Sequence, residues 1–324
     1  MQRRQLIHAI GAAALMGGRP SWAQEAYPAR AIQVLVGFPG GGAMDVATRV
    51  VTNALADEGV KPLAIINKPG ASATIATGQV ARASADGYTV LLSTSANLGI
   101  APYLYAKLPY DADKELVPVA QFGVAQSVIY GSPALGTRDL NALLRRVAAT
   151  PGRLNYASPG SGTTAHLAFE SLKAQRKLFI VHVPFRGSPA AITSVLSGEL
   201  DIGIDAIGPT LSHIKAGKIV PLAQTGSKRS ASLPDVPTLD ELGVRGIPSG
   251  TNLGFMMPSG TPAAVLSQWS AAMKRVLATP AVAEQLGAVG VDVAYRDARD
   301  YAATMASEQK LWQAAVKYSG AAAS

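Results

Sequence analysis

The stretch AIQVLVGFPGGGAMD, residues 31–45, decides the architecture of this chain. Residues 31–38 form an apolar run that predicts a buried strand. Three glycines, Gly40 to Gly42, then allow the backbone to turn sharply and to approach a bound group closely. Residues 46–55 place their apolar side chains on one face of a helix. This order of strand, glycine turn and helix is typical of an α/β domain with a site at the carboxyl edge of its sheet.

Strand-like and helix-like segments alternate along the rest of the chain, which predicts a parallel α/β architecture. Further strands are expected at 63–66, 88–93, 155–158, 178–183, 200–205, 219–225 and 253–257. Helices are expected at 74–83, 164–174, 190–196 and 210–216, followed by a helical tail at 262–278, 281–289 and 297–318.

The segment VPVAQFGVAQSVIY, residues 117–130, holds enough residues for two strands, with Gly123 between them. Such a segment suits a chain that passes from one lobe to another. We therefore expect a first lobe of residues 25–124 plus 248–324 and a second lobe of residues 125–247. The hinge is expected near Gly123 and Leu253.

A second glycine turn, SPGSGTTAH at residues 158–166, repeats the arrangement of the first. Gly160 and Gly162 supply the turn, and Thr163 and Thr164 supply hydroxyls at the start of a helix. The unpaired amides and the dipole of a helix N-terminus favour an anion. Two such turns, one in each lobe, can hold a carboxylate from both sides. The alternative reading, in which each turn is only a tight connection, stays open.

Composition limits the other functional classes. The chain has 324 residues, a formal net charge of +8 and no cysteine, which excludes disulfides and cysteine-based nucleophiles or metal sites. Basic residues occur at most in adjacent pairs without interleaved aromatic residues, so we expect no nucleic-acid binding. Few histidines are present and their spacing does not suit a metal site, so neither a metal nor an organic cofactor is expected.

Two enzyme-like readings are weak. Gly160, Gly162 and Ala165 fit the dinucleotide pattern G-x-G-x-x-[GA], but the next expected strand ends without an acidic residue for a ribose. A serine hydrolase would favour G-x-S-x-G, which the chain lacks.

Residues 1–24 have the features of a signal peptide: Arg3 and Arg4, an apolar stretch at 6–16, and the small-x-small sequence Ser21-Trp22-Ala23. This predicts export to the periplasm, with general secretion favoured over the twin-arginine route. No later apolar run approaches the ~18 residues of a membrane span.

The ordered motifs resemble those of the tripartite tricarboxylate transporter substrate-binding proteins, also called Bug receptors. The resemblance covers nearly the whole chain after residue 24. Its blocks are YPARAIQVLVGFPGGGAMD (27–45), NKPGAS (67–72), ADGYTVLLST (85–94), LPYD (108–111), YASPGSGTTAHLAFE (156–170), HVPFRG (182–187), SGELDIGIDAIGP (197–209), LPDVPTLDELG (233–243) and PSGTP (258–262).

The resemblance implies a type II periplasmic binding protein fold, with two α/β lobes joined by crossing hinge strands and a cleft between them. It implies a non-catalytic receptor, expected to be a monomer, that delivers a small organic carboxylate to membrane transporter subunits. A sensory module that reports the ligand to a signalling partner stays open as an alternative. The implied ligand-binding residues are Phe38, Gly41, Gly42, Ala43, Asp45, Ser93, Ser95, Ser158, Gly160, Gly162, Thr163, Thr164, His166, Phe185 and Asp205.

Three departures from the family pattern bear on the cleft. Gly37 and Gly40 stand where the family often has proline. Ser72 and Ala73 replace part of a glycine-rich stretch. Asn252 occupies the region where the family usually has tryptophan, which is expected to enlarge or polarise one wall of the cleft.

Overall fold

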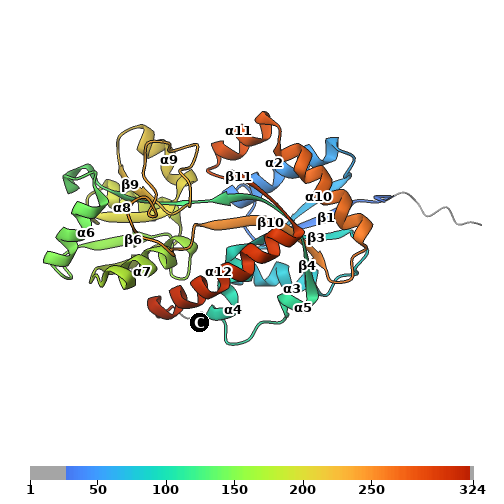
Figure 1. Cartoon of the computed structure of the whole chain (residues 1–324), viewed down its shortest axis with the longest axis horizontal. Helices are drawn as coiled ribbons and strands as arrows, with labels where there is room; N and C mark the ends of the chain where they lie inside the picture. Colours follow the sequence, from blue (N-terminus) through green and yellow to red (C-terminus); the bar gives the residue numbers. More distant parts are fainter. Residues whose placement is uncertain (1–26, 322–324) are drawn as a thin grey trace, which may run out of the picture.

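The structure is a computed structural model and describes residues 27–321, which form two α/β lobes (Figure 1). The signal peptide expected at residues 1–24 lies outside the described residues. Among residues 27–321, no helix combines the length and apolar character needed to cross a bilayer.

The first lobe is built on a six-stranded sheet in the order β11-β4-β10-β3-β1-β2. The three strands β1, β2 and β3 pair in parallel, whereas β10, β4 and β11 pair antiparallel. The strands are β1 (Ile32–Val36), β2 (Leu63–Asn67), β3 (Thr89–Thr94), β4 (Leu116–Ala125), β10 (Thr251–Pro258) and β11 (Asp292–Asp297). The longer helices are α2 (Ala43–Asp57), α3 (Thr74–Ala81), α10 (Ala263–Leu277), α11 (Pro280–Ala288) and α12 (Ala298–Ser319). Shorter ones are η2 (Ala71–Ala73), η3 (Ser95–Ile100), α4 (Ala101–Leu104) and α5 (Ala112–Glu115).

The second lobe is built on a five-stranded sheet in the order β7-β6-β8-β5-β9. Its strands are β5 (Ser127–Gly131), β6 (Asn155–Ser158), β7 (Val181–Pro184), β8 (Ile202–Ala206) and β9 (Val220–Gln224). Its helices are α6 (Leu140–Ala149), α7 (Thr164–Arg176), α8 (Ser188–Leu196) and α9 (Ile207–Lys215), with the short η4 (Pro133–Leu135). β6, β7 and β8 are parallel, while β5 runs antiparallel to both β8 and β9.

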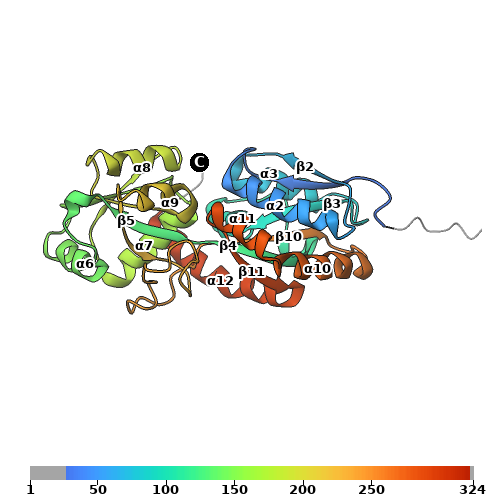
Figure 2. The same cartoon turned by 90° about the horizontal axis from the view of Figure 1, so that it is seen from above.

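The chain crosses between the sheets twice. β4 ends at Ala125 and β5 begins at Ser127, and the returning strand β10 pairs Thr251 with Ala125 at the same place. Figure 2 shows these strands passing through the middle of the molecule, with a lobe on either side. The hinge predicted near Gly123 and Leu253 therefore lies next to the crossing. These two residues are register partners just before the chain changes sheets.

Each lobe has its own apolar core, which explains why the strands read as nearly continuous apolar runs. In the first lobe, Phe255 contacts both Phe122 and Trp269, with ring centroids 5.3 and 5.7 Å away. In the second lobe, Tyr156 stacks on Phe169 at 4.1 Å. Burial of apolar side chains in these two cores stabilises the sheets.

The two-lobed α/β fold expected from the sequence is confirmed, but the expectation of a parallel architecture was too simple. Both sheets are mixed, because the crossing strands and their neighbours run antiparallel. The helical tail contains α10, α11 and α12, yet residues 292–297 between the last two form β11 at the edge of the first sheet. This strand is short and half-buried, so no apolar run marked it in the sequence.

A left-handed segment follows β2. Ala71, Ser72 and Ala73 have φ angles of 46°, 52° and 66°, a region that non-glycine residues rarely occupy. Ala73 packs directly onto Gly37, where a Cβ atom would collide with the Cβ of Ala73. Ala71, Ser72 and Ala73 therefore adopt the left-handed backbone conformation that glycine usually occupies.

Replacing Ser72 by glycine is expected to stabilise the fold, because Ser72 is exposed and its side chain makes no hydrogen bond within the described residues. Relief of the left-handed strain should exceed the entropic cost of glycine by roughly 0.5–1 kcal/mol. Urea unfolding measures the change. Ser72→Ala, which keeps the strain, is the matched control, and equal stability of the two variants would contradict the expectation.

Candidate functional site

The first glycine turn is held by the side chain of Asp45, which is 1% exposed. Its carboxylate accepts hydrogen bonds from the Gly41 amide (2.8 Å), Arg49 Nε (2.9 Å) and Asn67 Nδ2 (2.9 Å). Burial raises the pKa of Asp45, but these donors outweigh it and hold the pKa below its ordinary value. Asp45 thus fixes the shape of the turn with a charged group that already has its partners.

Other donors in this turn remain unpaired. Gly41 donates to Asp45 and Gly42 donates to the Pro39 carbonyl at 3.4 Å. Ala43 and Met44, at the start of α2, have backbone amides without an acceptor among the described residues. The first turn therefore offers an anion the amides at the start of α2, and the Gly40 amide also has no acceptor among the described residues.

The second turn is built in the same way but with a histidine. The Gly162 amide donates to His166 Nδ1 at 3.1 Å, and Thr163 Oγ1 donates to the Gly160 carbonyl at 2.8 Å. Thr164 and Ala165, at the start of α7, keep backbone amides without an acceptor among the described residues. Both lobes thus present unpaired amides at a helix start beyond the carboxyl end of a strand, β1 in one case and β6 in the other.

A buried aromatic stack supports the second turn. The rings of His166 and His182 lie 4.0 Å apart, and His182 stacks on Tyr156 at 4.8 Å. Glu170 accepts hydrogen bonds from Tyr156 and Lys173, and its Oε1 lies 3.9 Å from His166 Nε2. This arrangement fixes the imidazole that receives the Gly162 amide.

The same region contains a serine–histidine pair. Ser158 Oγ lies 2.6 Å from His182 Nε2. Ser158 is fully buried, however, and its hydroxyl also contacts the backbone of Gly160. A nucleophile must reach its substrate, so this pair gives the hydrolase reading no support.

Ser93, near the end of β3, and Ser95, at the start of η3, make side-chain hydrogen bonds to other elements of the first lobe. Ser93 Oγ bonds Tyr301 of α12 at 2.9 Å. Ser95 Oγ accepts from the Asn252 amide at 3.0 Å, which ties the end of β3 to the crossing strand β10. Their hydroxyls therefore link β3 and η3 to α12 and to the crossing strand β10. The sequence did not predict these contacts, because the alternation of residues along a strand does not reveal which face a distant helix covers.

Asp205 is 1% exposed at the end of β8. Its Oδ1 accepts from Ser188 Oγ (2.9 Å) and the Ala206 amide (2.7 Å), so it joins the starts of α8 and α9. Its Oδ2 is buried without a partner. The two aromatic candidates, Phe38 and Phe185, are half-buried against the core of their own lobes.

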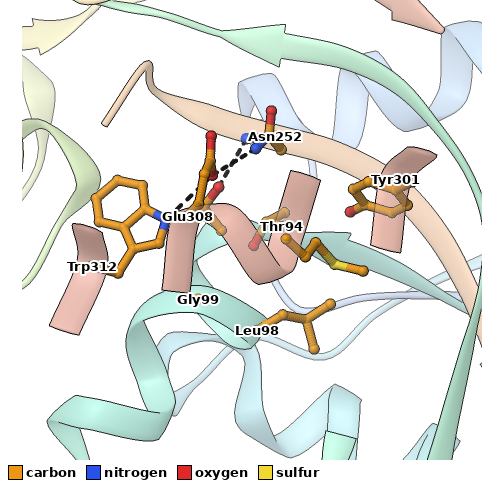
Figure 3. A pocket seen from close by; sticks show the side chains of 9 residues that line it. Thr94, Leu98, Gly99, Asn252, Tyr301, Glu308 and Trp312 are labelled. Atoms are coloured by element: carbon orange, nitrogen blue, oxygen red, sulfur yellow. Dashed lines mark hydrogen bonds between the residues drawn. The ribbon is translucent and has the colours of Figure 1, made fainter. Parts of the chain in front are cut away.

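Asn252 contacts α12 (Figure 3), and it also lines a cavity between the two lobes. Its Nδ2 donates to Glu308 at 2.7 Å, and its Oδ1 accepts from Gln121 at 3.1 Å. Trp312 Nε1 also donates to Glu308, at 3.3 Å. Asn252, Glu308 and Trp312 line a cavity of about 10 Å³, roughly the space of one water molecule. Asn252 thus polarises the hinge beneath α12.

The structure places the turns in different lobes without a hydrogen bond between them in the described part of the chain. The first turn adjoins Asn67 of β2 and Ala73. The second turn lies beside the hinge, where Thr164 Oγ1 and Thr251 Oγ1 are 3.0 Å apart. It also adjoins the start of α8, because the Gly187 amide donates to the Pro159 carbonyl.

Sequence reasoning missed the residues that hold the turns. Asn67 and Arg49 orient Asp45, and His182 supports His166. Asn67 carried a usable signal, since it ends a strand beside the one that precedes the first turn. Among residues 27–321, no group of three or more His, Asp or Glu side chains is arranged to hold a metal ion.

The histidine stack predicts a pH-dependent stability. Burial, with smaller effects from His182 and Lys173, lowers the pKa of His166 to about 3, and burial lowers that of His182 to about 4. As the pH falls below about 6.5, these two histidines therefore become protonated in the unfolded chain but stay neutral in the folded chain. We expect the free energy of unfolding to decline from pH 6.5 towards pH 4, by about 2 kcal/mol at pH 5 from His166 alone.

Chemical unfolding at several pH values measures this slope. His166→Gln should flatten it, whereas His213→Gln, outside the stack, should keep the wild-type profile. A wild-type profile without any decline between pH 6.5 and 4 would argue against neutral, buried histidines.

Asp205 gives a prediction of opposite sign. Burial raises its pKa to about 6, despite lowering by the bonds from Ser188 and Ala206. A raised carboxyl pKa costs stability as the pH rises from about 4 to 6, and the cost persists above that range. Asp205→Asn should therefore increase the free energy of unfolding at pH 8 by about 1–3 kcal/mol and have little effect at pH 4. Lower stability of the variant at pH 8 would reveal a required negative charge.

Known receptor proteins are similar to this chain over most of its length. Residues 47–320 match the model of the tripartite tricarboxylate transporter family receptor. The chain is similar to the protein BugT of Bordetella pertussis, with 33% identity over 298 residues, covering 92% of this chain and 91% of BugT.

Two solved structures from Rhodopseudomonas palustris share the fold. One is MatC with bound malate, at a TM-score of 0.74 and 29% identity, covering 90% of this chain and 100% of MatC. The other was solved with adipate, at a TM-score of 0.79 and 26% identity, covering 91% of this chain and 99% of that one. The extent of the family match and the identity to BugT lead to one conclusion: this chain belongs to the tripartite tricarboxylate transporter receptor family.

Proposed function

We propose that this protein is an exported receptor that holds one carboxylate of a small organic acid between the starts of α2 and α7. The observation that carries the proposal is the pair of helix starts with unpaired amides, one in each lobe. At α2 these amides belong to Ala43 and Met44, and at α7 to Thr164 and Ala165. Both helix dipoles favour a negative charge at this end.

The strength of such a site is adequate for capture of a solute. A hydrogen bond to a charged group contributes roughly 1.5–3 kcal/mol, and more than one is available from each helix start. After the cost of association, a handful of such bonds suits an affinity in the micromolar range, about −8 kcal/mol. Residues 25–324 carry 26 Lys and Arg against 21 Asp and Glu, and this formal net charge of +5 adds a weak, long-range attraction for anions.

The relatives guide the class of ligand. Malate and adipate, bound by the two R. palustris proteins, both carry two carboxylates on a short chain. We infer a ligand of this kind here. The two lobes would close over this ligand and present it to membrane transporter subunits. We assign residues 25–124 plus 248–324 to lobe 1 and residues 125–247 to lobe 2. Residues 1–24 would direct export to the periplasm.

Proline at the first position of each helix tests the proposal, because it removes one amide hydrogen without disturbing the helix. Gly42 and Thr163, which precede these positions, already have the extended backbone that proline requires, with ψ angles of 164° and 155°. Ala43→Pro and Thr164→Pro should each raise the Kd for malate or adipate by roughly ten- to a hundredfold, measured by calorimetry.

The matched controls keep the amide. Ala43→Ser changes the side chain only, and Thr164→Ala removes the hydroxyl that contacts Thr251. Both should bind the same acid with nearly wild-type affinity, and all four variants should melt within a few degrees of the wild type. Unchanged affinity in both proline variants would remove the helix starts from the site.

A further inference from the structure

A set of hydrogen bonds joins the lobes beside the strand crossings, and it centres on Asp292 at the start of β11. Asp292 Oδ1 accepts from Ser230 Oγ (2.9 Å) and from the Ala231 amide (3.2 Å). Asp292 Oδ2 accepts from Gln126 Nε2 (3.0 Å), at the crossing itself. We call Asp292 and these three donors the Asp292 clasp.

A further bond lies beside the clasp. Ser232 Oγ, in the same loop as Ser230, donates to the Gly287 carbonyl of α11 at 3.1 Å. The loop that follows β9 in the second lobe is thereby fastened to the corner between α11 and β11 in the first lobe. No lysine or arginine in the described residues lies within 4.0 Å of the Asp292 carboxylate, so it is stabilised by donors from the loop and the crossing.

The clasp and the glycine turns lie on opposite sides of the crossing strands. Figure 2 shows α3 and α8 on one side of β4, and β11 and α12 on the other. The first turn packs against the segment that leads into α3, through Gly37 and Ala73. The second turn bonds the segment that leads into α8, through Pro159 and Gly187.

The side that holds the clasp is hollow. A cavity of about 610 Å³ is lined by both lobes, and Gln126, Ala231 and Asp292 of the clasp are in its wall. The floor includes Val124 and Asn252 from the crossing strands. A rotation about the crossings that brings α3 and α8 together would widen this cavity.

Widening the cavity separates the loop that follows β9 from the corner at β11. The bonds to Asp292 are 2.9–3.2 Å long, and a hydrogen bond weakens steeply when it is stretched by more than a few tenths of an ångström. We propose that the Asp292 clasp holds the lobes in the arrangement of this structure, in which no hydrogen bond joins the two glycine turns among the described residues, and must be released before the turns can meet around a ligand.

The Asp292 clasp would then determine what fraction of the protein has its two glycine turns close together. A protein that closes only in a minor population binds its ligand with an apparent affinity reduced by that fraction. Removing the clasp should therefore favour closure without ligand and tighten binding. The part of this inference that concerns binding rests on the proposed function, whereas the part that concerns the lobe arrangement does not.

The chain has no cysteine, so two spin labels can be placed without other changes. Ile75→Cys on α3 and Ala190→Cys on α8 put the labels at exposed positions, one in each lobe. Pulsed electron paramagnetic resonance then measures the distance between them in the ligand-free protein. Asp292→Ala in this background should shift the distribution to shorter distances, and Ser230→Ala should do so to a smaller extent.

Calorimetry with malate is the second measurement. Asp292→Ala should lower the Kd about three- to tenfold. Asp240→Ala removes an exposed carboxylate of the second lobe and is the control that should change neither the distance nor the Kd. If Asp292→Ala does not fold, Asp292→Asn and Ser230→Ala take its place, because each weakens the clasp with a smaller change.

The two measurements separate the two proposals. Unchanged or longer label distances in the clasp variants would overturn the clasp, whatever malate does. Failure of malate and adipate to bind the wild type would instead count against the proposed ligand class, while the label distances would still decide the clasp. A weaker malate affinity in Asp292→Ala would show that the contact supports the closed form, which also overturns the proposal.

Discussion

The candidate site depends on backbone amides that are kept unpaired at the start of two helices. Such amides are available to an anion only if the turn before each helix is satisfied by other groups. Asp45 does this for the first turn with a carboxylate, and His166 does it for the second with a neutral imidazole. In each lobe, a side chain of the first helical turn accepts a hydrogen bond from a glycine amide of the preceding turn: the Asp45 carboxylate in the first lobe and the His166 imidazole in the second. This explains why each glycine turn is followed by a polar side chain.

The choice of holding group has electrostatic consequences. The Asp45 carboxylate lies near the start of α2, where a negative charge is favourable, and Arg49 and Asn67 complete its hydrogen bonds. Because its charge is matched locally, the nearby amides keep their attraction for a second anion. A protonated His166 could not accept from the Gly162 amide, so the burial that keeps it neutral is a condition of the turn geometry.

Local patterns were enough to predict the strand–turn–helix units and the two-lobed fold, since each signal lies within a few consecutive residues. What the sequence could not reveal depends on distant partners. The hydroxyls of Ser93 and Ser95 face Tyr301 and β10 because α12 and the crossing strand cover that face of β3. Likewise, β11 is a strand because the edge of β4 is free to pair with it, and nothing in residues 292–297 specifies that edge.

The same dependence on distant partners explains the polar residues at the hinge. Asn252 bridges Gln121 on the neighbouring crossing strand and Glu308 on α12, while burial raises the pKa of Glu308 against the bonds from Asn252, Trp312 and Ser249. Buried polar groups are costly unless every partner is in place, so such a network favours one arrangement of its elements. The network around Asn252 fixes α12 to the strands β4 and β10. Nearby, Asp292 fixes the loop that follows β9 in the second lobe. Hydrogen bonds of defined length are lost when the elements that they join move apart, so the network around Asn252 favours discrete arrangements of the strands and α12 over a continuous range.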